Sequence, residues 1–181
     1  MTETRIEIAG AGPAGLAAAI TLAKAGREVV VHEAYKEVGY RFGSLYQDFQ
    51  GLENWTTEQN VIELFEEQGL TTDFATLACY KGTAFDYKQR RYEISSDQPL
   101  FYMLERGPGP NTLDTALLKQ AQSLGVEVKF NSRLREITGE GIMAGGPKAA
   151  DAISAGYHFA TDMEDGYWVI CDDDLAPKGY S

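Results

Sequence analysis

Cysteine and histidine are scarce in this sequence of 181 residues, which contains two of each. Cys79 and Cys171 lie far apart with no CxxC spacing, so they predict neither a zinc site nor a disulfide framework. His32 and His158 are equally distant from each other, and no serine stands in a G-x-S-x-G pattern. The acidic run 172–174 has the character of a solvated turn. We therefore expect no metal site and no Ser-His hydrolase chemistry.

Basic residues and long apolar runs are also in short supply. The sequence has 16 Lys and Arg against 27 Asp and Glu, a formal net charge of -11, which would repel nucleic acid and anionic lipid. No window approaches the ~20 apolar residues of a membrane helix, and the charged residues 1–8 do not resemble a signal peptide. These absences predict a cytoplasmic protein with no integral membrane segment and no nucleic-acid partner. They leave its oligomeric state open.

What the sequence does contain is a strand, tight turn, helix and strand within its first 33 residues. Residues 5–9 form a β-branched run that ends at Gly10, and residues 13–25 are rich in Ala and Leu up to a stop at Gly26. Residues 28–32 form a second apolar strand. Two strands joined by such a helix are expected to be parallel neighbours in one sheet.

The middle of the chain changes its pattern. Residues 35–55 have no clean period, so we expect a long loop with one helical turn. Thr57 with Asn60 would cap a helix that runs through Glu67. Residues 72–105 alternate and are rich in aromatics, which predicts an antiparallel β-meander. Its expected strands are 76–80, 84–87, 91–94 and 100–104.

The helix-to-strand pattern then returns. Asn111 or Thr112 would begin a helix through residue 124, followed by a strand at 126–130. Further strands are expected at 134–138, 157–161 and 167–171. Together the elements predict an α/β, Rossmann-like fold in one domain over residues 1–181, with a mostly parallel sheet and an antiparallel β-meander.

A G-x-G-x-x-G pattern lies between the first strand and the first helix, which is where a dinucleotide-binding turn requires it. The first glycine permits a tight turn, the second lets a pyrophosphate approach the backbone, and the third lets helix and strand pack closely. Free amides and the helix dipole then face the phosphates. A glycine turn of purely structural use is the alternative. The six positions are Gly10, Ala11, Gly12, Pro13, Ala14 and Gly15.

Glu33 ends the second strand 18 residues after Gly15, close to the ~20 expected for an acid that hydrogen-bonds a ribose hydroxyl. A carboxylate there would repel a 2′-phosphate, so NADP is disfavoured in this pocket. The agreement of strand, turn, helix, strand and acid predicts an adenine dinucleotide as the ligand. The glycines alone do not separate FAD from NAD.

The run from Gly10 to Ala19, followed by Glu33, resembles the N-terminus of flavoprotein monooxygenases and reductases, in particular the geranylgeranyl reductase-like FAD oxidoreductases. A second stretch resembles a later segment of the same family. The resemblance implies that the Rossmann-like fold is an FAD/NAD(P)-binding fold, with FAD as the cofactor and NAD less favoured. The residues that carry the second stretch are Glu105, Arg106, Gly107, Leu113, Asp114, Leu117, Leu118, Ala121 and residues 125–128.

The resemblance also implies roles for individual residues. Glu33 and the adjoining Ala34 would lie at the adenosine ribose, and Arg41 would contact the phosphate or ribose side of the cofactor. Arg106 would reach the FAD from the end of the meander, and the backbone near Leu134, in the strand after residue 128, would lie against the adenine. The alternatives are exposed, salt-bridged arginines at 41 and 106 and simple core packing at Leu134.

Two departures from the family pattern bear on the function. Residues 142–148 contain no Gly-Ala-Asp-Gly segment, and the later Gly-Asp segment and substrate half have no place before Ser181. We therefore expect the front part of a flavin-dependent oxidoreductase, acting when complete on an apolar or isoprenoid-like substrate, and inactive by itself. An NAD-linked dehydrogenase fragment and a non-catalytic nucleotide-binding or interaction module are the alternatives. No catalytic residue is identified.

Overall fold

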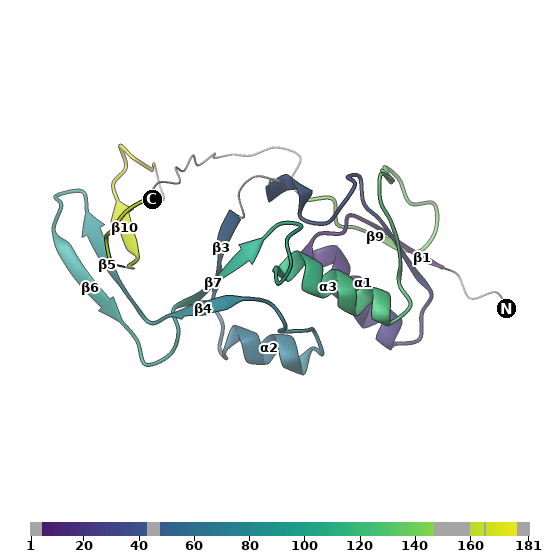
Figure 1. The fold of residues 1–181 in the computed structure, drawn as a ribbon, viewed down its shortest axis with the longest axis horizontal. Helices are drawn as coiled ribbons and strands as arrows, with labels where there is room; N and C mark the ends of the chain where they lie inside the picture. The colour runs from purple at the N-terminus through teal and green to yellow at the C-terminus, as the bar shows by residue number, and fades with distance from the viewer. Residues whose placement is uncertain (1–4, 43–47, 147–159, 165, 177–181) are drawn as a thin grey trace.

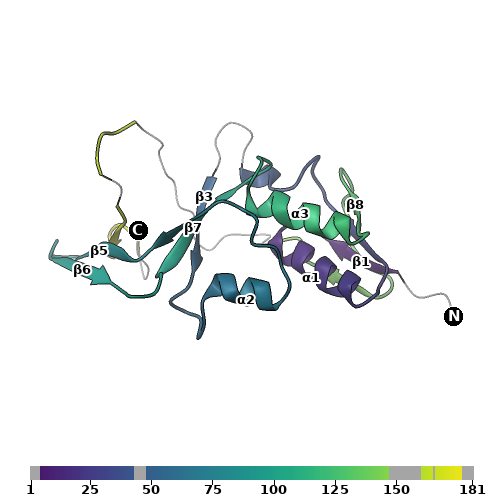
Figure 2. The ribbon, with the colours of Figure 1, turned by 60° about the horizontal axis from the view of Figure 1, so that its bottom comes forward.

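The protein is elongated, and three small sheets follow one another along its length (Figure 1). The computed structural model describes residues 5–42, 48–146, 160–164 and 166–176. A parallel sheet with two helices lies at one end, an antiparallel sheet with a third helix lies in the middle, and a second three-stranded sheet projects at the other end (Figures 1 and 2). The expected α/β class is confirmed.

The parallel sheet has four strands in the order β8-β2-β1-β9, and every neighbouring pair is parallel. Helices α1 and α3 pack against each other and share a core with the sheet. This arrangement confirms the expected Rossmann-like pattern, because a helix joins β1 to β2 and a second helix precedes β8. The elements are β1 (Ile6–Ala9), α1 (Pro13–Lys24), β2 (Val29–His32), α3 (Leu113–Ser123), β8 (Glu127–Lys129) and β9 (Gly141–Met143).

Local sequence explains the two helices. Helix α1 begins with Pro13 at its first position, where a missing N–H costs no hydrogen bond. Helix α3 begins at the cap Thr112, whose hydroxyl accepts from the backbone N–H of Thr115. Both helices are followed by a glycine with positive φ, +79° at Gly26 and +84° at Gly125, as helix ends favour.

The middle sheet is antiparallel, in the order β3-β7-β4. The expected helical turn within residues 35–55 is confirmed as the 3-10 helix η1 (Tyr40–Phe42), but the rest of that expected loop is not all loop, because β3 (Asp48–Glu53) pairs along its full length with β7 (Phe101–Arg106). Asn54 joins this strand to α2 (Val61–Glu67) by accepting from the N–H of Val61. The third strand is β4 (Thr76–Cys79).

The antiparallel strands expected at 72–105 are divided between two sheets rather than forming one meander. Strands β4 and β7 pair with each other, and the hairpin of β5 (Lys81–Asp86) and β6 (Arg91–Ser95) extends beyond them. Strand β10 (Trp168–Cys171) adds to β5 in parallel. We call β5, β6 and β10 the arm; it meets the middle sheet where the ring of Phe101 contacts Tyr167 edge to face, 5.0 Å between centroids.

The last expected strands are partly corrected. Residues 134–138 form no strand; the strand that joins the sheet is β9, which follows them and lies beside β1. The strand expected at 157–161 falls mostly outside the described residues, and 160–161 are irregular. The strand expected at 167–171 is confirmed from Trp168. Over the described ranges, no helix has the length and apolar character needed to cross a membrane.

Candidate dinucleotide site

The glycine turn lies at the carboxyl ends of the parallel strands, where ligands of open α/β sheets bind. Gly10 has a φ of +106°, and its N–H donates to the carbonyl of His32 at 2.8 Å. A Cβ at this position would lie 2.4 Å from the carbonyl oxygen of Ala144, just after β9. Gly10 therefore makes the tight turn and permits contact between the ends of three strands.

The other two glycines differ in what surrounds them. A Cβ on Gly15 would lie 2.0 Å from the carbonyl oxygen of Gly10, so this glycine allows the helix to pack on the strand. A Cβ on Gly12 would have no atom of the described structure within 4 Å. Close packing thus explains Gly10 and Gly15 but not Gly12. The open space at Gly12, beside the first turn of α1, fits a phosphate group that approaches the backbone.

Glu33 closes the turn from the neighbouring strand. Its Oε2 accepts from the N–H of Ala11 at 2.9 Å, and its Oε1 accepts from the N–H of Tyr35 at 3.0 Å. An ionised carboxylate has about four lone-pair positions, so both oxygens retain capacity to accept a hydroxyl. The structure therefore brings Glu33 and the glycine turn together, with Ala34 half-buried in the bend between Glu33 and Tyr35.

The chain after β8 runs beside the same bend. The N–H of Ser132 donates to the carbonyl of Glu33, and the N–H of Asn131 donates to the carbonyl of Tyr35, each at 2.8 Å. Leu134 follows in irregular backbone, half-buried, and not in the strand where it was expected. The glycine turn, residues 33–35 and residues 131–132 thus form one hydrogen-bonded frame at Glu33.

His32 has a structural partner in this frame. Its Nδ1 is hydrogen-bonded to the hydroxyl of Ser132 at 2.8 Å, and its Nε2 lies 3.6 Å from a carboxylate oxygen of Glu7. The ring thus ties the end of β2 to the chain beyond β8. Among the described residues no group of three or more His, Cys, Asp and Glu side chains is arranged to hold a metal.

Arg106 lies at the end of β7 and is buried, with 7% of its surface exposed. Its Nε and Nη2 donate to the two carboxylate oxygens of Asp114 at 2.8 and 2.9 Å, a bidentate pair. Nη1 donates to the side-chain carbonyl of Gln50, and the guanidinium carbon lies 4.3 Å from the ring centroid of Phe42. Three of its five N–H groups therefore have acceptors within the protein.

Asp114 is the partner of Arg106 that the sequence analysis did not identify. It is 1% exposed and also accepts from the N–H of Gly107 at 3.0 Å, so it fixes the end of β7 to the start of α3. The only available signal was its place in the stretch with Arg106 that resembles the flavoproteins. Spacing alone does not show that the two side chains meet.

Arg41 lies in η1, which directly follows the contact between Gly39 and the turn that contains Gly107. A Cβ on Gly39, which has a φ of +65°, would lie 2.6 Å from the Cα of Gly107, so the two backbones touch. The Arg41 side chain is exposed and makes no ion pair or hydrogen bond with another described residue. The salt-bridged alternative for Arg41 is therefore not seen in the described structure, whereas Arg106 is ion-paired and buried rather than exposed.

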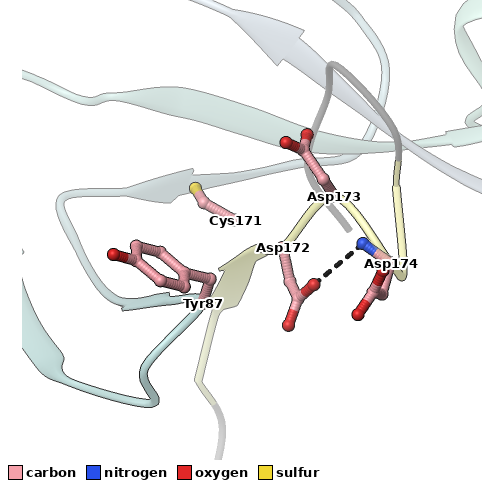
Figure 3. Close-up of a pocket in the computed structure, with 5 residues that line it drawn as sticks. All are labelled: Tyr87, Cys171, Asp172, Asp173 and Asp174. Carbon is pink, nitrogen blue, oxygen red and sulfur yellow. Dashed lines mark hydrogen bonds between the residues drawn. The ribbon is translucent and has the colours of Figure 1, made fainter.

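A separate hollow lies at the far end of the arm (Figure 3). Tyr87, Cys171 and the acidic residues 172–174 line it. The N–H of Asp174 donates to the Asp172 carboxylate at 2.9 Å, so part of the charge serves the turn itself. Three carboxylates would repel a pyrophosphate, and the glycine turn lies at the other end of the molecule (Figure 1). The hollow is not the dinucleotide site.

Comparison with known proteins agrees with the glycine turn. A sequence profile of the FAD binding domain family matches residues 3–157, most of the chain. No curated protein matches the chain in sequence.

Several solved flavoprotein structures share the fold. A tetrameric 2-methyl-3-hydroxypyridine-5-carboxylic acid oxygenase is 23% identical with a TM-score of 0.55, and the match covers 74% of this chain and 33% of the oxygenase chain. A geranylgeranyl bacteriochlorophyll reductase-like protein from Thermoplasma acidophilum is 18% identical with a TM-score of 0.55, covering 75% and 32%. The p-nitrophenol 4-monooxygenase of Pseudomonas putida DLL-E4 is 21% identical with a TM-score of 0.55, covering 75% and 34%. This chain thus spans about a third of their length.

Proposed function

This chain belongs to the FAD binding domain family, and on that premise we propose that its glycine turn and Glu33 hold the adenosine diphosphate part of FAD. FAD is the cofactor of the family. The observation that carries the placement is a contrast: a Cβ added to Gly12 would meet nothing within 4 Å, whereas one added to Gly10 or Gly15 would collide with backbone. At Gly12 no protein atom fills the space beside the backbone, so this space is available to a ligand.

The roles follow from the chemistry of the groups. Backbone N–H groups at the start of α1 and the positive end of the helix dipole would stabilise the pyrophosphate. Glu33 would accept from a ribose hydroxyl while it keeps its two bonds to the turn. Ala34 and the backbone near Leu134 would border the adenosine. Arg41, exposed and cationic, would supply a charge to the phosphate side, and Arg106 has two N–H groups left for the cofactor.

For the complete protein we propose flavin-dependent oxidation or reduction, in which bound FAD exchanges electrons or hydride with a substrate and the chain supplies position and electrostatics. An apolar or isoprenoid-like substrate is supported by the fold shared with the geranylgeranyl bacteriochlorophyll reductase-like protein. An aromatic substrate is the second candidate, supported by the fold shared with the hydroxypyridine-carboxylate and nitrophenol oxygenases.

The placement is tested by Gly12→Val. The backbone at Gly12 (φ -74°, ψ 174°) accepts a side chain, and the space is open, so the apo protein should keep its stability. The new methyl groups would occupy the space assigned to the pyrophosphate. FAD at about 100 times its Kd should stabilise the wild type by about 2.7 kcal/mol, measured by urea unfolding, and should leave Gly12→Val unchanged.

Gly139→Val is the matched control, because Gly139 also has open space around its Cβ position but lies outside the turn. It should keep the stabilisation by FAD. Stabilisation that survives in Gly12→Val would place the pyrophosphate elsewhere. Stabilisation of the wild type by NAD⁺ and not by FAD would favour the dehydrogenase alternative.

The substrate class is tested on the complete protein, loaded with FAD whose flavin has been reduced by light with EDTA as the electron donor. Under anaerobic conditions an isoprenoid alkene should reoxidise the flavin, as its absorbance shows. Air alone also reoxidises reduced flavin, so the aromatic class would be favoured by a different result: no anaerobic reoxidation by the alkene, and consumption of p-nitrophenol only when oxygen is present.

A further inference from the structure

The Arg106 guanidinium contacts two different kinds of group. Its edge is occupied by the Asp114 carboxylate, and its central carbon lies over the Phe42 ring, 4.3 Å from the ring centroid. The bidentate pair fixes the plane of the guanidinium, because both bonds lie in that plane. Phe42 therefore meets a planar cation whose orientation is already set. A contact of this kind contributes about 0.5–2 kcal/mol, depending on desolvation.

Phe42 in turn is one of two anchors of the segment 39–42. The other is Gly39, whose backbone touches Gly107 with no room for a Cβ. The N–H of Phe42 donates to the carbonyl of Gly39 at 2.9 Å, which closes the single turn of η1. Arg41 lies between the two anchors, with its side chain exposed. The turn thus has two fixed points and an exposed cation between them.

We infer that Phe42 is a positioning residue, which holds Arg41 toward FAD by stacking on the Arg106 guanidinium. The inference rests on the proposed function for its ligand. Asp114 already neutralises Arg106, so the buried charge does not require Phe42. A free Arg41 side chain has several rotatable bonds, and a fixed backbone reduces the entropy lost when it meets a phosphate. Loss of the stack should therefore weaken FAD binding through Arg41.

A double-mutant cycle tests this coupling. The variants are Phe42→Leu, Arg41→Gln and the two together, and the measurement is the Kd for FAD from quenching of flavin fluorescence. We expect each single variant to weaken FAD binding about 5-fold, near the ~1 kcal/mol of one such contact, and the double variant to be no weaker than either. Independent effects would multiply to about 25-fold, and that result would overturn the inference.

Phe42→Tyr is the rescue variant, because it keeps an aromatic face, whereas Phe42→Leu keeps apolar volume without one. The tyrosine should restore both the wild-type Kd and the decrease of FAD affinity with added salt that Arg41 supplies. A purely structural role for Phe42 would give the same unfolding free energy and the same FAD affinity for Leu and Tyr, which would also count against the stack.

A measurement without cofactor separates this inference from the proposed function. Arg41 is the only basic residue between Lys36 and Lys81, so trypsin cleavage after it is assigned by fragment mass. If the stack holds the turn, apo Phe42→Leu should be cleaved after Arg41 at least about 5-fold faster than apo Phe42→Tyr, the ratio set by the same ~1 kcal/mol. Equal rates would refute the positioning role even if FAD binds. A wild type that does not bind FAD would refute the proposed function and the cofactor part of this inference, whatever the cleavage rates.

Discussion

The two ends of the molecule bury their apolar side chains to very different degrees. In the parallel sheet with α1 and α3, which we call the body, Ile8, Leu16 and Ile20 have no exposed surface and Leu117 has 1%. In the arm, Thr83 is the only strand residue that the structure describes as buried. Trp168 is 51% exposed. The body has a buried core, which continues into the middle sheet through Phe74 and Leu104, whereas the arm is a thin sheet attached to the middle one.

The physical cause lies in the number of layers. A sheet buries a face only when another layer covers it, and α1 and α3 supply that layer for the body. The arm consists of three strands, at the lower limit for independent stability. Its apolar residues lie on both faces: Trp168 and Ile170 share one face with their partners Thr83 and Phe85, and Val169 lies on the other face beside Ala84. We expect the free energy of unfolding to come mainly from the body.

The largest loss of stability should follow from Asp114→Ala, at the point where the body meets the middle sheet. The change leaves the buried Arg106 guanidinium without its carboxylate, which costs about 3–5 kcal/mol. Urea unfolding followed by circular dichroism measures it. Asp114→Asn, which keeps the size and one acceptor, should lose less. A loss below about 1 kcal/mol in Asp114→Ala would show that water reaches the guanidinium.

Leu117→Ala should come next, with a loss of about 2–5 kcal/mol from the removed apolar contacts and the cavity left in the core. Lys119→Ala on the same helix is the matched control; its side chain is exposed, and the change should stay within about 0.5 kcal/mol. Similar losses in the two variants would mean that α3 is not part of a packed core.

The same difference between the ends decides how far the sequence predicts the structure. In the body, β1, the glycine turn, α1 and β2 are contiguous, and each carries a local signal in its glycines, cap or apolar run. The spacing also predicted that Glu33 and the turn serve the same ligand, and the structure joins the two through the N–H of Ala11. Local signals suffice where neighbours in sequence are also neighbours in space.

Elsewhere the partners are distant in sequence. Strand β3 contains Gly51 and has no clean alternation, and it is a strand because it pairs with β7 about fifty residues later. Residues 134–138 have a suitable composition but no strand beside them, while the glycine-led β9 lies against β1. The contact of Arg106 with Asp114 and Phe42 has the same origin. Such pairings depend on the assembled fold, and no local pattern of residues encodes them.

The smallest effect is expected in the arm, from Ile170→Thr. Ile170 is 37% exposed on β10, and threonine keeps the β-branched shape that strands favour. The free energy of unfolding should change by about 0.5 kcal/mol or less, measured by urea unfolding beside Leu117→Ala. A loss as large as that of Leu117→Ala would show that this face of the arm is covered in solution, and the contrast between the two ends would fail.

The same measurement is made at low and at high protein concentration, because an interface between copies of the chain would make the loss depend on concentration. A small loss at both concentrations would confirm that the arm contributes little to the stability of the fold.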